Sequence, residues 1–263
     1  MSVMNREPGI HPTALVHKDA SLGEGVRVGP YSIIEANAEI GAGSMIGSHV
    51  RIESCVRMGS ANRVFQGAVL GSPPQDLKFR GEESFLTIGS GNTIREYVTM
   101  NPGTGEGEET RIGDENMFMA YVHVAHNCRI ADQVIIANAV QLAGHVEVEE
   151  FAILGGMTPV HQFVKIGAHA FVGGGSRVAQ DVPPYLRVAG SPPRVAGLNL
   201  VGLQRRNFPM DSLEELKKVY RVVYRQDLNL SQAMDKLDSE EIKDTHALRF
   251  LDFILKSERG ITR

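Results

Sequence analysis

The sequence predicts a mostly β protein in which a long coiled β-solenoid is followed by a small helical domain. Three observations predict this: an apolar residue at every sixth position, a small residue after most of those positions, and a later change to helical spacing. From Ile10 to Val178, 26 of the 29 positions reached in steps of six are apolar, whereas a composition of 42% apolar residues would fill roughly twelve by chance. A period of six fits neither an α-helix nor an alternating strand, but it suits a solenoid with short flat faces.

The coils are expected to turn at corners directly after the inward residues. The residue in that place is usually glycine or alanine, as at Gly23, Gly47 and Ala131. Such residues suit a corner where a Cβ or a positive φ would matter. Four residues after each inward position the side chain is again mostly small or β-branched, as a narrow interior requires.

This repeat resembles that of the hexapeptide-repeat proteins, which fold as left-handed parallel β-helices. In that family three hexads, or about 18 residues, make one triangular coil. The triangular coil and its left hand are implied by the resemblance alone, because the usual rule for parallel crossovers favours the right hand.

Two stretches interrupt the repeat, at about residues 72–87 and 101–111. Both are rich in proline, glycine and charge, so we expect loops that leave the coils. Loops on a rigid scaffold often carry function, although a tolerated surface insertion has the same composition.

A composition change divides the chain into a β-helix domain over residues 1–190 and a helical domain over residues 191–263. Two proline pairs end the repeat after residue 182, and helical spacing follows. The helical piece has too small a core to be stable alone, so we expect it to pack on the solenoid or on a neighbouring subunit.

Three helices are expected in the second domain. Asp211 and Ser212 resemble the N-cap of the first, a short helix is expected from near Ser231, and a last helix is expected from near Ser239 to Gly260.

Composition limits the function classes. The formal net charge of −4 argues against a nucleic-acid-binding protein. Cys55 and Cys128 fall at interior positions, which is typical of buried thiols in a reducing compartment. The N-terminus carries no apolar leader, and no uncharged run approaches the length of about 18 residues that a membrane span needs. We therefore expect a cytosolic protein without an integral membrane segment.

Histidines are the outstanding polar feature of the second run of coils. They are His123, His126, His145, His161 and His169. With 18 residues per coil, His126, Gly144 and Gln162 form one column with about 4.8 Å between neighbours. An imidazole and a bare backbone amide are therefore expected together on one face.

Three interpretations of this cluster are open. His126 could be a general base, with the N–H of Gly144 stabilising the oxyanion of an acyl-transfer intermediate. His123, His126 and His145 could instead bind zinc and leave a fourth position for water. That arrangement resembles the hexapeptide-repeat carbonic anhydrases, although their two nearby ligands are more widely spaced. The histidines could also be ordinary hydrogen-bonded surface or interface residues.

Six strings occur in order along the chain: PQDLKF (74–79), VHVAHNC (122–128), QLAGHV (141–146), GGMTPVHQF (155–163), AQDVPPY (179–185) and NLVGLQRRNF (199–208). Together they resemble the cytosolic UDP-N-acetylglucosamine O-acyltransferases that begin lipid A synthesis. The similarity covers essentially the whole chain, including its helical end.

The resemblance implies a role for each matching residue. It makes His126 the general base for the sugar 3-hydroxyl, Gly144 the oxyanion donor and Gly174 the ruler that measures the acyl chain. It assigns substrate binding to Asp76, Lys78, His123, His145, His161 and Gln162, and the nucleotide end to Asn199, Arg205 and Arg206. Arginine suits a diphosphate because its planar fork can bind two oxygens at once.

The chain departs from the family pattern at three places. Asn127 stands where an aspartate is common after the catalytic histidine, and an amide can orient an imidazole but cannot offset its positive charge. Asn101-Pro102 stands where the family has a histidine and a basic residue, and Val201 where it has a glutamate. Acyl transfer is still expected, and a 3-amino sugar is an open alternative to the 3-hydroxyl acceptor.

The resemblance also implies the partners. The donor is a 3-hydroxyacyl group on the acidic acyl carrier protein, and Gly174 predicts a long chain such as 3-hydroxymyristoyl. A homotrimer is implied, and no cofactor or metal is expected. A basic stripe suited to the carrier is formed by Lys217, Lys218, Arg221 and Arg225.

Two other functions remain alternatives. The chain could be a different hexapeptide acyltransferase that uses a coenzyme A thioester. It could also be a β-helical scaffold, but a scaffold needs neither the histidine column nor two charged loops.

Overall fold

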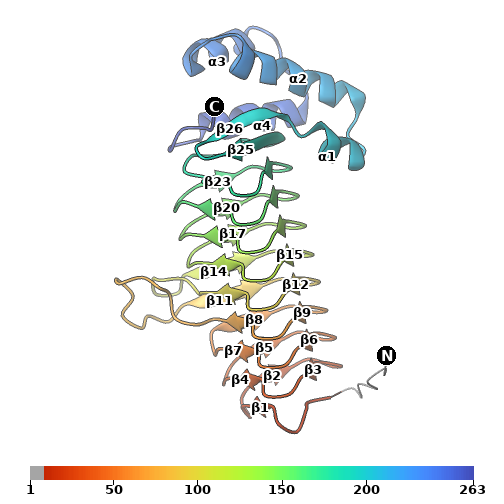
Figure 1. Cartoon of the computed structure of the whole chain (residues 1–263), viewed down its shortest axis with the longest axis vertical. Helices are drawn as coiled ribbons and strands as arrows, with labels where there is room; N and C mark the ends of the chain where they lie inside the picture. The colour runs from red at the N-terminus through yellow and green to blue at the C-terminus, as the bar shows by residue number, and fades with distance from the viewer. Residues whose placement is uncertain (1–8) are drawn as a thin grey trace.

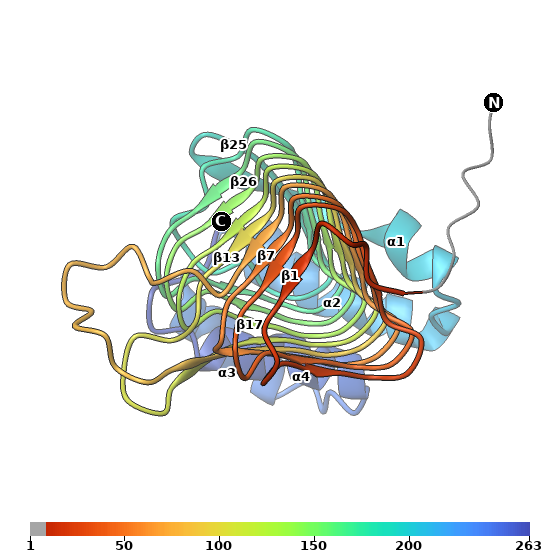
Figure 2. The same cartoon turned by 90° about the horizontal axis from the view of Figure 1, so that it is seen from below.

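The computed structural model describes residues 9–263, so the first eight residues of the expected N-terminal domain lie outside the described part. The chain winds into a triangular column, and its helices gather at the end opposite to the N-terminal coils (Figures 1 and 2). Each coil contributes one short strand to each of three sheets, whose strands run parallel except in the last hairpin.

Within each of the three sheets, strands of successive coils pair with one another. The first sheet contains β1 (Leu15–Val16), β4 (Ile33–Ile34), β7 (Arg51–Ile52), β10 (Val69–Leu70), β13 (Thr99–Met100), β16 (His123–Val124), β19 (Gln141–Leu142) and β22 (Pro159–Val160). The second contains β2 (Ser21–Leu22), β5 (Glu39–Ile40), β8 (Val56–Met58), β11 (Phe85–Ile88), β14 (Glu109–Ile112), β17 (Arg129–Ile130), β20 (Glu147–Val148) and β23 (Lys165–Ile166). The third contains β3 (Arg27–Val28), β6 (Met45–Ile46), β9 (Arg63–Val64), β12 (Thr93–Ile94), β15 (Met117–Phe118), β18 (Ile135–Ile136), β21 (Ile153–Leu154), β24 (Phe171–Val172), β25 (Leu186–Gly190) and β26 (Pro193–Leu198).

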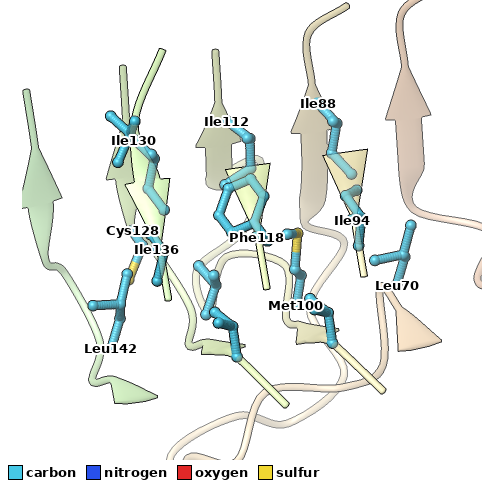
Figure 3. Close-up of a cluster of buried hydrophobic side chains, with 14 of the residues drawn as sticks. Leu70, Ile88, Ile94, Met100, Ile112, Phe118, Cys128, Ile130, Ile136 and Leu142 are labelled. Carbon is cyan, nitrogen blue, oxygen red and sulfur yellow. The ribbon is translucent and has the colours of Figure 1, made fainter. Parts of the chain in front are cut away.

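The six-residue repeat is the interior of this column. Val124 pairs with Leu142 and Leu142 with Val160 on successive coils, and all three side chains are buried. Figure 3 shows the same arrangement for a stack of hydrophobic side chains that point inward from all three sheets. Each such side chain contributes about 1.5–3 kcal/mol through burial, so the repeat is the main source of stability.

Most coil corners place a non-glycine residue in the left-handed region, and a few place a glycine there. The first corner joins the first and second sheets at Asn127, His145 and Phe163; the second joins the second and third sheets at Gln133, Phe151 and His169; the third joins the third and first sheets at Ala139, Met157 and Gly175. The cost of a positive φ is offset by hydrogen bonds between coils, such as the one donated by the His145 N–H to the His126 carbonyl over 3.0 Å.

Most of the glycines directly after the inward residues meet the first of the two needs that the sequence indicated, a place where a Cβ would not fit. Gly41 does not have a positive φ; a Cβ there would lie 2.4 Å from the carbonyl carbon of Gly59 on the next coil. Close approach of two coils, and not a left-handed φ, therefore requires glycine at this position.

Both expected loops leave the column at the first corner. One connects β10 to β11 and the other connects β13 to β14. They protrude together from the column (Figure 2), and the N–H of Gly107 donates to the Glu83 carbonyl over 2.7 Å to join them. β11 and β14 are each four residues long and pair along their whole length, so both loops have a rigid base.

The β structure continues beyond residue 190. β25 and β26 form an antiparallel hairpin that ends the third sheet at Leu198, and the helices α1 (Leu200–Arg205), α2 (Met210–Arg225), α3 (Leu230–Asp238) and α4 (Thr245–Leu255) follow. The expected boundary at residue 190 thus falls inside this hairpin.

Two helix starts differ from the sequence prediction. Asp211 and Ser212 do not cap α2, because its N-cap is Pro209; Ser212 instead donates to Asp244 over 2.6 Å. The last helix does not begin near Ser239, because Asp244 accepts hydrogen bonds from the first turn of α4. The carboxylate of Asp244 satisfies amides that a helix start leaves unpaired, and this decides where α4 begins.

The helical domain packs on the end of its own β-helix. This is one of the two arrangements that the sequence predicted. Tyr185 is fully buried in the shared core, and Arg249 of α4 pairs with Glu149 and Glu150 on the coils. Within residues 9–263, no helix is both long and apolar enough to cross a membrane.

Candidate active site

His126 lies at the first corner, directly against the backbone of the next coil. A Cβ added to Gly144 would lie 2.5 Å from Cε1 of His126, so only glycine leaves room for the imidazole there. The first loop reaches the same place, since Oδ2 of Asp76 lies 3.8 Å from Nε2 of His126. The geometry therefore brings together the imidazole and the bare amide that the repeat predicted as neighbours, and it adds the loop carboxylate that only the family resemblance implied.

Two further imidazoles flank His126. The ring of His145 meets that of His126 edge-on with 5.2 Å between centroids, and Nδ1 of His123 lies 2.7 Å from Oγ1 of Thr99. Burial, and then the proximity of His126, lower the pKa of both His123 and His145. Both rings are therefore held neutral at neutral pH, where each can donate one hydrogen bond and accept another.

The Nδ1 side of His126 is held by Asn127, as the sequence suggested, and through it by two loop residues that sequence reasoning did not single out. Oδ1 of Asn127 lies 2.9 Å from Nδ1 of His126, and Thr104 and Glu108 of the second loop contact the same amide. The signal that could have found them is the place of the second loop, which interrupts the repeat one coil before His126.

The remaining residues expected near the first corner are more exposed. Lys78 donates its backbone N–H to Asp76 over 2.9 Å, which shapes the loop, while its side chain lies on the surface. Gln162 is exposed one coil beyond Gly144, and Nη2 of Arg259 lies 3.2 Å from Nδ1 of His161. A groove of about 490 Å³ runs beside these coils and is lined in part by His145, Phe163 and Arg259.

The residues expected at the nucleotide end lie at the second corner. Arg206 stacks over the ring of Phe151 with its Cζ 4.0 Å from the centroid, and Arg205 is exposed at the end of α1. The Asn199 side chain is already engaged, because it caps α1 through Gly202 and donates to the His169 carbonyl over 3.0 Å.

Gly174 lies at the third corner. A Cβ there would lie 3.1 Å from the carbonyl oxygen of Gly156, so a larger side chain would be crowded on one side. Within one chain the predicted site residues thus form three groups on three corners, and only the group around His126 is in mutual contact.

The predicted basic stripe lies on α2. Nζ of Lys218 pairs with Glu240 at 3.1 Å, and Nε of Arg225 donates to the Tyr220 hydroxyl over 3.0 Å. Lys217 is partly buried, while Arg221 and Arg225 are exposed. The outer part of the stripe is therefore carried by the two arginines.

In the part of the chain that is described, no group of three or more His, Cys, Asp or Glu side chains lies in a geometry that could hold a metal ion. Cys128 is buried and Cys55 partly buried, and both are free. Burial raises the pKa of the Cys55 thiol to about 11, which makes it a poor nucleophile.

Comparison with known proteins agrees with this geometry. Residues 10–60 match the bacterial transferase hexapeptide family (six repeats), and residues 181–262 match the family described as UDP N-acetylglucosamine O-acyltransferase, domain 2. The chain is 52% identical to the acyl-(acyl-carrier-protein)–UDP-N-acetylglucosamine O-acyltransferase of Verminephrobacter eiseniae, over 97% of this chain and 99% of that relative.

Solved structures give the same result. The UDP-N-acetylglucosamine acyltransferase of Bacteroides fragilis is 38% identical with a TM-score of 0.94, covering 96% of this chain and 99% of that one. The enzyme of Francisella novicida is 37% identical with a TM-score of 0.93, covering 97% of this chain and 94% of that one. The left-handed parallel β-helix with a helical C-terminal domain is thereby confirmed, and the chain belongs to the UDP-N-acetylglucosamine O-acyltransferase family.

Proposed function

We propose that this protein transfers a 3-hydroxyacyl group from acyl carrier protein to the 3-hydroxyl of UDP-N-acetylglucosamine, the first step of lipid A biosynthesis. The observation that carries the proposal is the contact between His126 and Gly144 at the first corner. The names of relatives that are about half identical over nearly the whole chain support the same reaction.

The proposed chemistry uses both residues. Nε2 of His126 takes the proton of the sugar 3-hydroxyl, and the oxygen attacks the thioester carbonyl. The N–H of Gly144 stabilises the negative charge on the tetrahedral intermediate. When the carbon–sulfur bond breaks, the thiolate of the carrier takes the proton back from His126, so the base is regenerated.

Substrate binding is proposed for the residues around this pair. Asp76, Lys78, His123, His145, His161 and Gln162 line or approach the first corner, and neutral imidazoles suit the hydroxyl groups of a sugar. Arg205 and Arg206 are proposed to bind the diphosphate, because both guanidinium groups are exposed and can each bind two oxygens. Asn199 would then act mainly by holding the start of α1 that carries Arg205.

We propose a homotrimer. The three groups of predicted site residues lie on three different corners of one chain, so packing between chains is what would combine them into one site. Sedimentation equilibrium should give three times the mass of one chain. A monomer with full activity would contradict the proposal.

The length of the acyl chain is proposed to depend on Gly174. Replacing it with methionine should shift the preferred donor to chains several carbons shorter, because a bulky side chain cannot fit a close-packed groove without strain. Wild type and Gly174→Met would be compared on donors of graded length. An equal loss on every donor would mean that the glycine only shapes the backbone.

The reaction itself is tested by mass spectrometry of products. Purified protein would be given UDP-N-acetylglucosamine or its 3-amino analogue, with 3-hydroxyacyl groups on acyl carrier protein or on coenzyme A. An O-acylated sugar nucleotide formed from the carrier-bound donor is the expected product. Turnover only with the amino sugar or only with coenzyme A would replace the proposal with the corresponding alternative.

The zinc alternative and the location are tested separately. Activity should survive exhaustive chelation, and one tightly held zinc per subunit whose removal abolishes activity would favour the metal interpretation of the histidines. The cytosolic location stays a prediction, to be checked by cell fractionation.

A further inference from the structure

The side-chain amide of Asn127 is held at both ends by the second loop. Its Oδ1 accepts from the backbone N–H of Thr104 over 3.2 Å and from the hydroxyl of Thr104 over 2.9 Å. Its Nδ2 donates to Oε2 of Glu108 over 2.7 Å, and the same carboxylate oxygen accepts from the N–H of Gly105 over 2.9 Å. The amide therefore joins His126 to a carboxylate from another coil.

Two of these partners fix which way the amide points. A backbone N–H can only donate and a carboxylate can only accept, so Oδ1 must face Thr104 and Nδ2 must face Glu108. The reversed amide would put its NH₂ group against the N–H of Thr104 and its oxygen against the carboxylate. Both contacts would be repulsive, so the second loop allows a single orientation.

The orientation of the amide in turn decides the tautomer of His126. Oδ1 can only accept, and Nδ1 of His126 lies 2.9 Å from it, so Nδ1 must carry the proton. The lone pair of the neutral ring is then on Nε2, the atom that faces Asp76. This is the tautomer that a base acting through Nε2 needs.

Glu108 also provides a charge that the amide lacks. A hydrogen bond from Asn127, then one from the N–H of Gly105 and the proximity of His145 and His126, lower the pKa of the Glu108 carboxyl. It is therefore ionised at neutral pH. When His126 becomes positively charged during proton transfer, the Glu108 carboxylate lies on its Nδ1 side, separated from it by the Asn127 amide. The Asp76 carboxylate lies on its Nε2 side.

The loop is built to bring Glu108 to this place. A Cβ on Gly105 would lie 2.7 Å from Cδ of Glu108, so glycine is needed for the carboxylate to fold back over the loop. The carbonyl of Glu108 accepts from the N–H of Phe85 over 2.9 Å, which fixes the backbone at the base of the loop. Asn127 adopts a φ of 59°, a conformation that asparagine tolerates better than most residues.

We propose that Glu108, acting through Asn127, is a positioning residue that holds the proton of His126 on Nδ1 and keeps Nε2 free as the base. The inference rests on the proposed role of His126. The inference assigns a function to the second loop. It also explains how a chain with Asn127 in this place can still orient a catalytic imidazole and place a negative charge near it.

The direct test is the tautomer of His126, measured from the ¹⁵N chemical shifts of its two ring nitrogens in the full-length protein at a pH where the ring is neutral. The signals would be assigned by their loss in His126→Ala. Wild type should show the Nδ1–H form. Glu108→Ala should show part of the population in the other tautomer, since only Thr104 then opposes reversal of the Asn127 amide. Glu106→Ala is the matched control, because Glu106 is a loop carboxylate that contacts Glu83 instead.

Kinetics provide the second readout. Glu108→Ala should lower kcat by about tenfold or more, less than the loss of the base itself, with little change in KM for the sugar nucleotide. The acid limb of its pH–rate profile should move to lower pH, because a cation on His126 loses a nearby anion. A residue that only held the loop in shape would raise KM and leave this limb in place.

A double variant tests the coupling. Asn127→Asp alone places two carboxylates side by side and should lower kcat, whereas Glu108→Ala with Asn127→Asp should recover most of the activity, because either oxygen of the new carboxylate accepts from Nδ1. An unchanged tautomer in Glu108→Ala, or no recovery in the double variant, would overturn the inference. A tautomer shift without loss of turnover would support the coupling and contradict the base role of His126 in the proposed function.

Discussion

His145 and His169 occupy the same place in two different corners of the β-helix, and their surroundings give them different chemistry. Both have a positive φ, 61° and 57°, and each ring stacks on a phenylalanine. The centroids of His145 and Phe163 are 4.6 Å apart, and those of His169 and Phe151 are 4.7 Å apart. The repeat therefore gives both histidines the same backbone and the same kind of aromatic contact.

What covers each corner makes the difference. The first corner is met by the two loops, which bring Asp76 and Glu108 close to His145 and its neighbour His126. The second corner is covered by the helical domain, whose Phe208 packs edge-on against the buried ring of His169. The coil therefore supplies the geometry, while non-repeating segments decide whether a histidine is available for chemistry or only for packing.

The largest effect is expected from a substitution at the first corner. His126→Ala should fold and assemble normally but lose at least about 100-fold in kcat, the usual scale for a general base. Steady-state kinetics and thermal unfolding of the same preparation measure both properties. If kcat at saturating substrate stayed near the wild-type value, another group would be the base.

A smaller effect is expected when the two matched histidines are each replaced by phenylalanine. His145→Phe keeps a ring that can stack on Phe163 but loses both nitrogens, so kcat/KM for the sugar nucleotide should fall by about tenfold. His169→Phe should leave kcat/KM unchanged, because this ring is enclosed by Phe151 and Phe208. Equal losses in the two variants would mean that the ring of His169 also acts on the substrate.

The outer face of the helical domain should affect the donor alone. Reversing Arg221 and Arg225 to glutamate should raise KM for the acyl carrier protein by several-fold and leave KM for the sugar nucleotide unchanged. Added salt should weaken the wild type in the same direction, because exposed charges are screened over about 10 Å at 0.1 M. A donor KM that responds to neither change would make the stripe an ordinary solvated helix face.

The smallest effect concerns acid stability. Burial, opposed in part by Glu150, lowers the pKa of His169 to about 4, whereas the unfolded side chain titrates near its usual value of about 6.5. Between these values the unfolded chain binds more protons than the folded chain. The contribution of His169 to the free energy of unfolding is therefore complete above about pH 6.5 and is lost as the pH drops toward 4.

His169→Phe should remove this part of the acid sensitivity. In the wild type, Nδ1 of His169 has no hydrogen-bond partner within residues 9–263, so the substitution removes no hydrogen bond of that nitrogen. Thermal unfolding at pH 7 and pH 5 would show a smaller decrease in Tm for the variant than for wild type, with His49→Phe, a change at an exposed corner residue, as the control. The same decrease in both proteins would exclude His169 as a source of acid sensitivity.

Much of the first corner could be predicted from the sequence because its residues lie on the repeat. Once the coil length is given, His126 and Gly144 must be neighbours, and Asp76 could be placed near them only through the family resemblance. Thr104 and Glu108 were missed, since a loop that leaves the repeat has no period from which its path can be calculated.

The sequence by itself determined a solenoid with an aliphatic interior, because an apolar residue at every sixth position fits neither an α-helix nor an alternating strand. The coil length that aligns the histidine column came from the family resemblance. Only the tertiary structure decided that Glu108 contacts Asn127, that the Asn199 side chain caps α1, and that α4 begins after Asp244. These contacts join segments far apart in the chain whose paths depend on many weak interactions at once, so no local pattern specifies them.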